Sequence, residues 1–336
     1  MNTNSSKNSG VRQAIGTGPW AGPSDRFMRA GYREPMPVAE RLQRVVELRR
    51  QGLVEGLETR YPGEVNEENV SEFKHFLEDN DLVVASVGTP ISSERLFARG
   101  TLTARDPAVR RAAIERVKAS MDVSAEIGCN RVNFFLGQDG CDYPFEVDYE
   151  DAWNWTIEGL GEMAAHRRDV QVCIEYKPFE PRRRIFLNNV GITLWLIDQV
   201  GADNLGAVFD AGHAMMVGEN LGESICLLGK ANRLFYVHFT DNYRNFDDDM
   251  IVGSVHFIHF VEAVYWLKRV GYTGWQSLDL YPYREDPDVA VTQSIWLLKR
   301  LGAFVDETGL DTITGLLRQG DGGRSLQAIY GCLLGI

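Results

Sequence analysis

Short apolar runs alternate with longer segments of helical period along nearly the whole chain. Each short run is rich in β-branched or aromatic residues and predicts a strand, whereas each longer segment predicts a helix. From residue 11 onward the pattern gives eight strands that alternate with eight helices. Alternating strands and helices form a parallel sheet, and eight such units close most naturally into a (β/α)8 barrel. The expected fold class is therefore α/β, a TIM barrel.

The predicted elements divide the chain into three parts. The strands are expected at 11–20, 54–62, 81–90, 129–137, 170–178, 205–213, 234–242 and 274–282. The helices are expected at 38–52, 68–80, 106–128, 148–168, 192–200, 221–232, 255–271 and 288–302. The barrel then occupies 11–302, after a flexible tail at 1–10 that is rich in Asn and Ser. Residues 303–336 predict a C-terminal helical arm.

The overall charge and the cysteines exclude several classes of protein. The 336 residues include 35 Lys and Arg against 47 Asp and Glu, a formal net charge of −12, which argues against a nucleic-acid binder. Neither a long apolar run nor a signal-peptide core is present, so we expect neither a membrane span nor export. Five scattered Cys without a CxxC pair are typical of reduced thiols, and we expect a cytoplasmic protein.

Polar residues stand at the carboxyl ends of four successive predicted strands, where the catalytic groups of such barrels lie. These residues are Glu175 and Lys177, Asp210 with His213 in the following turn, His238 and Asp241, and Asp279. A single acidic residue at a strand end is ordinarily a helix cap or an ion-pair partner. Burying four such groups in one barrel mouth is unfavourable unless a cation neutralises them. Three carboxylates and one imidazole, from Glu175, Asp210, His238 and Asp279, suit Mn²⁺, Co²⁺ or Mg²⁺.

An acidic triplet follows the seventh predicted strand at 247–249. One interpretation is a solvated acidic loop. The other is a second, catalytic ion held by Asp247 and Asp249 together with His213. Alternate residues of an extended segment point the same way, so Asp247 and Asp249 can converge while Asp248 faces outward.

Several residues are candidates for contact with a substrate. Lys177 lies two residues after Glu175 and so on the same face of the strand, either as a counter-ion or as a donor to a substrate oxygen that becomes negative. His213 and Asp241 are further candidates at the same mouth. Trp155 either stacks on a sugar or packs in the core. His256 and His259 lie three residues apart in a predicted helix and are interpreted as a helix face.

These residues resemble the xylose isomerase-like barrel superfamily, which includes sugar isomerases, sugar 3-epimerases and the endonuclease IV group. The resemblance covers about 35–300, and its specific part is 170–282. There the segments EYKPFEP, FDAGH, VHFTDN and DDDMIVGS look most like bacterial L-rhamnose isomerase.

The resemblance implies a role for each matching residue. In that family the four strand-end residues hold a first metal ion, and here they are Glu175, Asp210, His238 and Asp279. The His of the DAGH segment and the first and third Asp of the triplet hold a second ion, which implies His213, Asp247 and Asp249. The family lysine falls on Lys177. Catalytic roles are thereby implied for Glu175, Lys177, His213 and Asp279.

Two departures from the family pattern bear on the substrate. The spacing between His238 and the triplet is about one residue longer than the family pattern, and the chain is shorter than rhamnose isomerases. The sugar 3-epimerases use a Glu on the last strand as one of two acid/base carboxylates, whereas this chain has Asp279, which is one methylene shorter. The endonuclease IV branch needs more metal-binding His, and the net charge disfavours DNA.

We therefore expect a metal-dependent aldose–ketose isomerase with one or two ions per chain, Mn²⁺ or else Co²⁺ or Mg²⁺. A hydride shift and an enediol proton transfer remain equally compatible with the residues. Two alternatives stay open. One is a ketose 3-epimerase. The other is the larger subunit of a C-glycoside deglycosidase, a metal-dependent lyase that acts on 3-oxo-glycosides with a small partner subunit. Related barrels are often dimers or tetramers, so we also expect a homo-oligomer.

Overall fold

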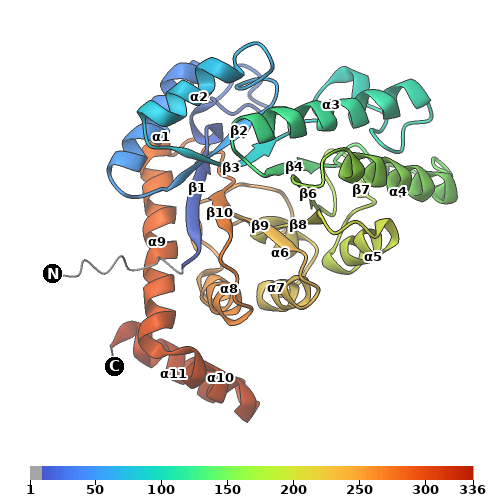
Figure 1. The fold of residues 1–336 in the computed structure, drawn as a ribbon. Helices are drawn as coiled ribbons and strands as arrows, with labels where there is room; N and C mark the ends of the chain where they lie inside the picture. Colours follow the sequence, from blue (N-terminus) through green and yellow to red (C-terminus); the bar gives the residue numbers. More distant parts are fainter. Residues whose placement is uncertain (1–9, 336) are drawn as a thin grey trace.

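Eight parallel strands close into a barrel in the computed structural model of this chain, which describes residues 10–335 (Figure 1). The barrel strands are β1 (Arg12–Gly16), β2 (Gly56–Arg60), β3 (Val83–Gly88), β4 (Arg131–Phe135), β6 (Gln171–Glu175), β8 (Leu205–Asp210), β9 (Leu234–Phe239) and β10 (Trp275–Leu278). They follow one another around the ring in chain order, and β1 pairs with both β2 and β10. The predicted (β/α)8 fold is confirmed.

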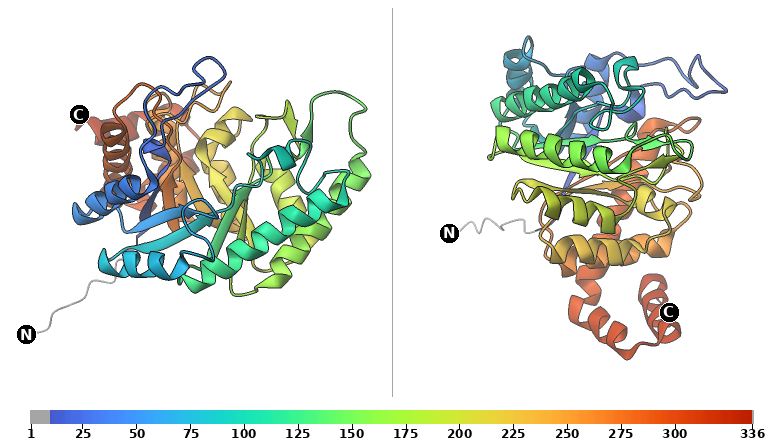
Figure 2. Two further views of the ribbon diagram at one scale, coloured as in Figure 1. Left: turned by 90° about the horizontal axis from the view of Figure 1, so that it is seen from above. Right: turned by 90° about the vertical axis from the view of Figure 1, so that its right-hand side faces the viewer.

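A helix follows each barrel strand and covers the outside of the ring (Figures 1 and 2). These helices are α1 (Val38–Arg50), α2 (Val70–Asp79), α3 (Pro107–Glu126), α4 (Tyr149–His166), α5 (Val190–Val200), α7 (Leu221–Lys230), α8 (Phe257–Arg269) and α9 (Pro287–Thr308). Several begin at an Asp or Asn whose side chain accepts hydrogen bonds from the first turn. Asp148, for example, accepts from the N–H groups of Glu150 and Asp151.

The segment 205–213 differs from its prediction as a strand that runs into a glycine turn. The strand β8 ends at Asp210, and the residues after it form a short helix, α6 (Ala211–Met216). The cause is Asp210 itself, because its Oδ1 accepts a hydrogen bond of 2.9 Å from the N–H of His213 and so caps this helix. The helix holds His213 directly above the end of β8.

Smaller elements lie outside the ring. Two 3₁₀ turns, η1 (Gly18–Trp20) and η2 (Arg95–Phe97), follow β1 and β3. The short strands β5 (Gly140–Cys141) and β7 (Arg184–Ile185) pair with each other in antiparallel fashion. No helix in residues 10–335 is both long and apolar enough to cross a membrane.

Two further helices complete the chain and confirm the C-terminal helical extension. Helix α9 continues past Gly302 to Thr308, and Gly309 with φ 86° ends it. Helices α10 (Leu310–Gln319) and α11 (Gly322–Leu334) then form a hairpin that projects from the barrel wall (Figures 1 and 2). The predicted tail at 1–10 falls almost wholly outside the described residues.

Two apolar layers stabilise the barrel. The larger one lies between the strands and the surrounding helices, and a smaller one fills the inside of the ring. The inner layer consists of Ala14, Ala85, Cys173, Val208, Tyr236 and Trp275. It closes the lower part of the barrel, so that the carboxyl ends of the strands are left for polar residues.

Replacing Gly56 by Ala should destabilise the barrel, because an added Cβ would lie 2.7 Å from ring carbons of Trp275. Such overpacking costs about 1–3 kcal/mol. Urea unfolding monitored by circular dichroism measures the change. Gly63→Ala is the matched control, because no atom lies within 4 Å of the position of its added Cβ. Equal stability of the two variants would contradict this packing of β2 against β10.

Candidate metal centre

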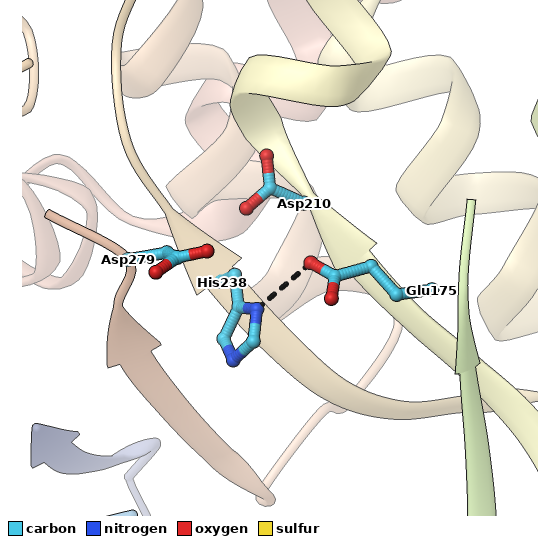
Figure 3. A group of neighbouring side chains, drawn as sticks. All are labelled: Glu175, Asp210, His238 and Asp279. Carbon is cyan, nitrogen blue, oxygen red and sulfur yellow. Dashed lines mark hydrogen bonds and ion pairs between the residues drawn. The ribbon is translucent and has the colours of Figure 1, made fainter. Parts of the chain in front are cut away.

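Four side chains from four successive strands meet at the carboxyl end of the barrel (Figure 3). They are Glu175, Asp210, His238 and Asp279, and one ligand atom from each lies within 4.8 Å of the others. We call this set the four-residue cluster. The first three are buried and Asp279 is half-buried. Nδ1 of His238 donates to Oε1 of Glu175 at 2.9 Å.

Strand register explains why these four residues meet. Asp210 on β8 pairs directly with His238 on β9, and His238 pairs with Ser277 on β10. Glu175 is the last residue of β6, and Asp279 follows β10 immediately. Because all strands are parallel, their carboxyl ends lie at the same end of the ring, and the side chains converge there.

Several buried polar atoms around the cluster have no hydrogen-bond partner within residues 10–335. They are Oδ2 of Asp210, Nδ1 of His213, Oδ1 of Asp247 and Oδ1 of Asp249. Buried polar groups are nearly always paired, so three orphaned carboxylate oxygens in one place indicate a ligand that supplies positive charge. Carboxylate oxygens and imidazole nitrogen are the ligands of Mn²⁺, Co²⁺ and Mg²⁺. The residues present therefore fit a divalent cation.

The pKa shifts reflect the same crowding of negative charge. Burial raises the pKa of the Asp210 carboxyl to about 7. The charge of His213 lowers this pKa, whereas the nearby Glu175 carboxylate raises it further. Burial also raises the pKa of Asp279. Burial opposes the charged imidazolium of His213, but the Asp210 and Asp247 carboxylates raise its pKa to about 9. In the absence of a cation the site therefore retains protons at neutral pH.

The second predicted group lies beside the cluster. Oδ2 of Asp247 accepts hydrogen bonds from Nζ of Lys177 at 2.7 Å and pairs with Nε2 of His213 at 3.0 Å. Nζ of Lys177 also lies 3.3 Å from the Glu180 carboxylate. Lys177 is thus a counter-ion to Asp247 in this structure, and it lies 5.5 Å from the ring centre of Phe135.

Asp249 is also directed towards this end of the barrel. Burial, together with the neighbouring Asp247 and Asp279 carboxylates, raises the pKa of Asp249 well above its usual range. Asp248 between them accepts a hydrogen bond from the N–H of Tyr243 instead. Of the residues described, only the four-residue cluster brings three or more ligand atoms within 4.8 Å of one another, so a second ion needs a rearrangement around Asp247.

Glu58 is a site residue that the sequence analysis missed. It lies on β2, across the barrel, and its Oε2 lies 3.0 Å from Nε2 of His238 and accepts a hydrogen bond from the Tyr236 hydroxyl at 2.9 Å. Burial opposes its charge, but His238 lowers the pKa of Glu58 to about 2. The only sequence signal was a charged residue in the middle of the short strand GLETR, which also contains Arg60.

Arg60 is a second residue that the sequence analysis missed. It follows Glu58 on the same face of β2 and donates a hydrogen bond to the hydroxyl of Tyr281. The phenol ring of Tyr281 lies 5.8 Å from its guanidinium carbon. The N–H of Tyr281 in turn donates to the Asp249 carbonyl at 3.3 Å, which links β2 to the segment that carries the acidic triplet.

The structure does not bring Asp241 or Trp155 to the cluster. The Asp241 carboxylate is fully buried and accepts hydrogen bonds from groups of residues 242, 255 and 256, so it is not free to contact a substrate. Trp155 lies on α4 with the Arg110 guanidinium 4.1 Å from its ring centre. It lines a separate cavity of about 1010 Å³ whose lining includes no cluster residue.

Comparison with known proteins shows which family model and which enzymes this chain resembles. Residues 47–301 match the family model described as xylose isomerase-like TIM barrel. The chain is 27% identical over 245 residues to a xylose isomerase of Thermus thermophilus, which covers 71% of this chain and 62% of that enzyme. It is 28% identical over 237 residues to a xylose isomerase of Thermus caldophilus, which covers 69% of this chain and 60% of that enzyme. The chain thus spans less than two thirds of the length of these curated relatives.

Solved structures of sugar epimerases share the fold at low sequence identity. An L-ribulose 3-epimerase superposes with a TM-score of 0.70 at 17% identity over 89% of this chain and 96% of its own. A 3-keto-D-glucoside 4-epimerase of E. coli superposes with a TM-score of 0.64 at 16% identity over 86% of this chain and 99% of its own. The likeness to rhamnose isomerase inferred from the four short segments stays a prediction.

Replacing Asp279 by Ala should weaken Mn²⁺ binding at least about a hundredfold, because loss of a direct ligand exceeds the 10–100-fold effect of its outer partners. Asp248→Ala is the matched control, since this neighbouring carboxylate contacts the Tyr243 N–H rather than the cluster. Isothermal titration calorimetry measures both affinities. Unchanged binding in Asp279→Ala would refute the assignment of the cluster.

Binding of a divalent cation should release protons at neutral pH. Ligand carboxylates bind metal in the ionised form and His in the neutral form. The folded-state pKa of Asp210 is about 7 and the pKa of His238 is raised well above its ordinary value by Glu58 and Glu175, so both cluster residues are largely protonated at pH 6 and must lose protons on binding. We expect affinity to fall by up to about tenfold per proton and per pH unit as the pH drops from 8 to 6. Calorimetry in buffers of different ionisation enthalpy counts the protons, and a count of zero with a flat affinity would contradict these shifts.

Proposed function

The chain belongs to the xylose isomerase-like TIM barrel family, and from this premise we propose that it is a divalent-metal-dependent sugar isomerase that interconverts an aldose and a ketose. The observation that carries the proposal is the four-residue cluster, in which one ligand atom from each of four strands lies within 4.8 Å of the others. Lys177 and His213 beside it supply donors that can reach a bound sugar. The similarity to xylose isomerases supports the same reaction class.

The cluster residues would hold the ion through Glu175, Asp210, His238 and Asp279. When bound, a divalent ion supplies Lewis-acid polarisation of adjacent substrate oxygens. Mn²⁺ is our first choice, with Co²⁺ and Mg²⁺ as alternatives, because the donor set mixes carboxylates with one imidazole. Glu58 holds His238 from the opposite side of the barrel and so fixes the orientation of this ring.

Lys177 is proposed to act on the substrate carbonyl oxygen. Its ammonium group is almost fully buried, and its pKa is raised because Asp247, Asp249 and Glu180 outweigh the effect of burial. It is therefore charged at neutral pH. A fixed cation stabilises an oxygen that gains negative charge during the reaction. The side chain would exchange part of its contact with Asp247 for the substrate oxygen.

His213, Asp247 and Asp249 are proposed to hold a second ion. Each has a buried polar atom without a hydrogen-bond partner inside the described range, which supports this assignment. His213 would then serve both as a ligand and, through its contact with Asp247, in the movement of the hydroxyl proton. Glu175, Lys177, His213 and Asp279 remain the proposed catalytic residues.

Two further activities compete with isomerisation. A 3-epimerase requires two acid/base carboxylates, and Asp279 is one methylene shorter than the Glu used for this purpose in the family pattern. A C-glycoside deglycosidase requires a small partner subunit and an oxidised glycoside. The isomerase remains the favoured proposal because the Lys177–Asp247–His213 group supplies a cation beside the cluster, at hydrogen-bond distances of 2.7 and 3.0 Å.

The location and assembly of the protein are also proposals. The five Cys are all free, and Cys129, Cys141 and Cys173 are buried, which supports a reducing compartment such as the cytoplasm. Leu317 on α10 and Leu326, Tyr330 and Leu334 on α11 are exposed. These apolar side chains on the projecting hairpin support a homo-oligomer.

The proposed function is tested by incubating the Mn²⁺-loaded protein with free aldoses and ketoses and separating the products by chromatography. We expect aldose–ketose conversion that stops when a chelator removes the ion and resumes when Mn²⁺ is restored. Conversion between two ketoses would identify the epimerase instead. Activity that appears only with a 3-oxo-glycoside and a partner subunit would identify the lyase. A lack of conversion in all three assays would overturn the proposal.

Replacing Lys177 by Met should lower kcat by about 10²–10³-fold while Mn²⁺ binding at the four-residue cluster persists, since Lys177 is not a ligand there. Lys230→Met is the matched control, because Lys230 lies in the exposed last turn of α7. Steady-state kinetics and metal analysis measure the two properties. If Lys177 were only a counter-ion, kcat would be retained.

A further inference from the structure

We propose that Asp241, His256 and Arg244 form a latch that positions the acidic loop, which we define as residues 242–254. The acidic loop carries Asp247 and Asp249, so the inference rests on the proposed second-ion role of these residues. The latch residues touch neither the cluster nor a substrate. They act as positioning residues, because they hold the two ends of the loop together at its neck.

Asp241 is the centre of the latch. Its carboxylate is completely buried, and each of its two oxygens makes two polar contacts. Oδ1 accepts from the N–H of Asn242 at 2.9 Å and contacts Nδ1 of His256 at 2.8 Å. Oδ2 accepts from the N–H groups of Val255 and His256 at 2.8 and 2.9 Å. One side chain therefore joins the residues just before the acidic loop to those just after it.

Backbone contacts close the loop further. Asp241 and Met250 exchange two hydrogen bonds, of 3.1 and 2.9 Å, in an isolated antiparallel bridge. The chain between them turns back sharply, with positive φ at Arg244 (70°) and Asp249 (47°). Residues other than glycine adopt such values only where the surrounding structure holds them. The latch and the bridge help to do so, together with the N–H of Tyr281, which donates to the Asp249 carbonyl at 3.3 Å.

Arg244 determines which ring nitrogen of His256 carries the proton. Its Nε donates to Nε2 of His256 at 3.1 Å. An imidazole nitrogen that accepts a hydrogen bond carries no proton, so the ring proton is on Nδ1, where it donates to Asp241. The N–H of Arg244 also donates to Oδ1 of Asn242 at 2.8 Å. The hydrogen bonds thus run from Arg244 to His256 and from His256 to Asp241.

The acidic loop needs an anchor because the carboxylates at the barrel mouth repel the carboxylates that the loop carries. Asp247 and Asp249 enter a mouth that already holds the carboxylates of Asp210 and Asp279, and this crowding contributes to the raised pKa of Asp249. Lys177 and His213 contact only Asp247 directly, through its Oδ2, whereas the Lys177 charge acts on Asp249 without a hydrogen bond. Anchoring at the neck therefore opposes the tendency of Asp249 to move out into water. Without the latch, we expect the loop to open and the second ion to be lost first.

The test uses the full-length protein with Arg244→Ala, whose wild-type side chain is exposed and whose loss leaves the core intact. Mn²⁺ titration by calorimetry is expected to show the first site unchanged and the second weakened at least about tenfold. Arg244→Lys should restore the second site, because a lysine ammonium can donate to the same imidazole nitrogen. His259→Ala is the control, since it removes the 3.4 Å contact to Arg244 but leaves the Asp241–His256–Arg244 chain in place.

Amide hydrogen exchange separates the latch from the proposed function. In Arg244→Ala we expect exchange of the amides of Asp241, Met250, Val255 and His256 to be at least about tenfold faster, whether or not the protein binds metal. Faster exchange with a native protein that binds no second ion would refute the second-ion role while supporting the latch. Unchanged exchange and unchanged Mn²⁺ binding in Arg244→Ala would overturn the latch. A buried-site variant, Asp241→Asn, gives a larger effect of the same sign on exchange if it folds.

Discussion

Mutual repulsion among buried carboxylates is the constraint on which the rest of this structure depends. Two unit charges 4 Å apart interact by about 4 kcal/mol at an effective dielectric constant of 20. Glu175, Asp210 and Asp279 bring their oxygens within 4.8 Å of one another, and Asp247 and Asp249 lie beside them. Lys177, His213 and His238 offset part of this charge. Asp210 and His213 retain protons near neutral pH, and these protons reduce the repulsion that a bound cation would otherwise reduce. The carboxylate oxygens without a hydrogen-bond partner lie where such a cation would bind.

The barrel brings these charges together at the ends of its strands, with a register irregularity between Ala207 and Val208 on β8. Each ligand stands at or near the end of a different strand, and the parallel register fixes their common height. The apolar layer below, with Tyr236 and Trp275, keeps water out of the lower barrel. The acidic loop, which carries Asp247 and Asp249, is anchored separately through Asp241.

The sequence predicted the elements that local pattern determines. A polar residue at the end of an apolar run identified Glu175, Asp210, His238 and Asp279. These residues meet because the carboxyl ends of parallel strands lie at the same end of the barrel. Contacts across the ring carry no such signal. Glu58 was missed because its partner His238 lies 180 residues away. Asp241 was assigned to the substrate because it follows a strand, yet its oxygens are taken by a backbone turn that only the folded loop creates. Trp155 was a candidate for stacking on a sugar, and it lines a cavity apart from the cluster, which helical period alone does not reveal.

The central claim is that the four-residue cluster is a metal centre, and anomalous X-ray diffraction at the manganese absorption edge tests it most directly. Crystals grown with Mn²⁺ should show a strong anomalous peak in contact with Glu175, Asp210, His238 and Asp279. A second, weaker peak near His213 and Asp247 would extend the account to two ions. If Mn²⁺ bound elsewhere, or if the cluster gave no peak at saturating Mn²⁺, the account of this barrel as a metal-dependent sugar isomerase would be contradicted.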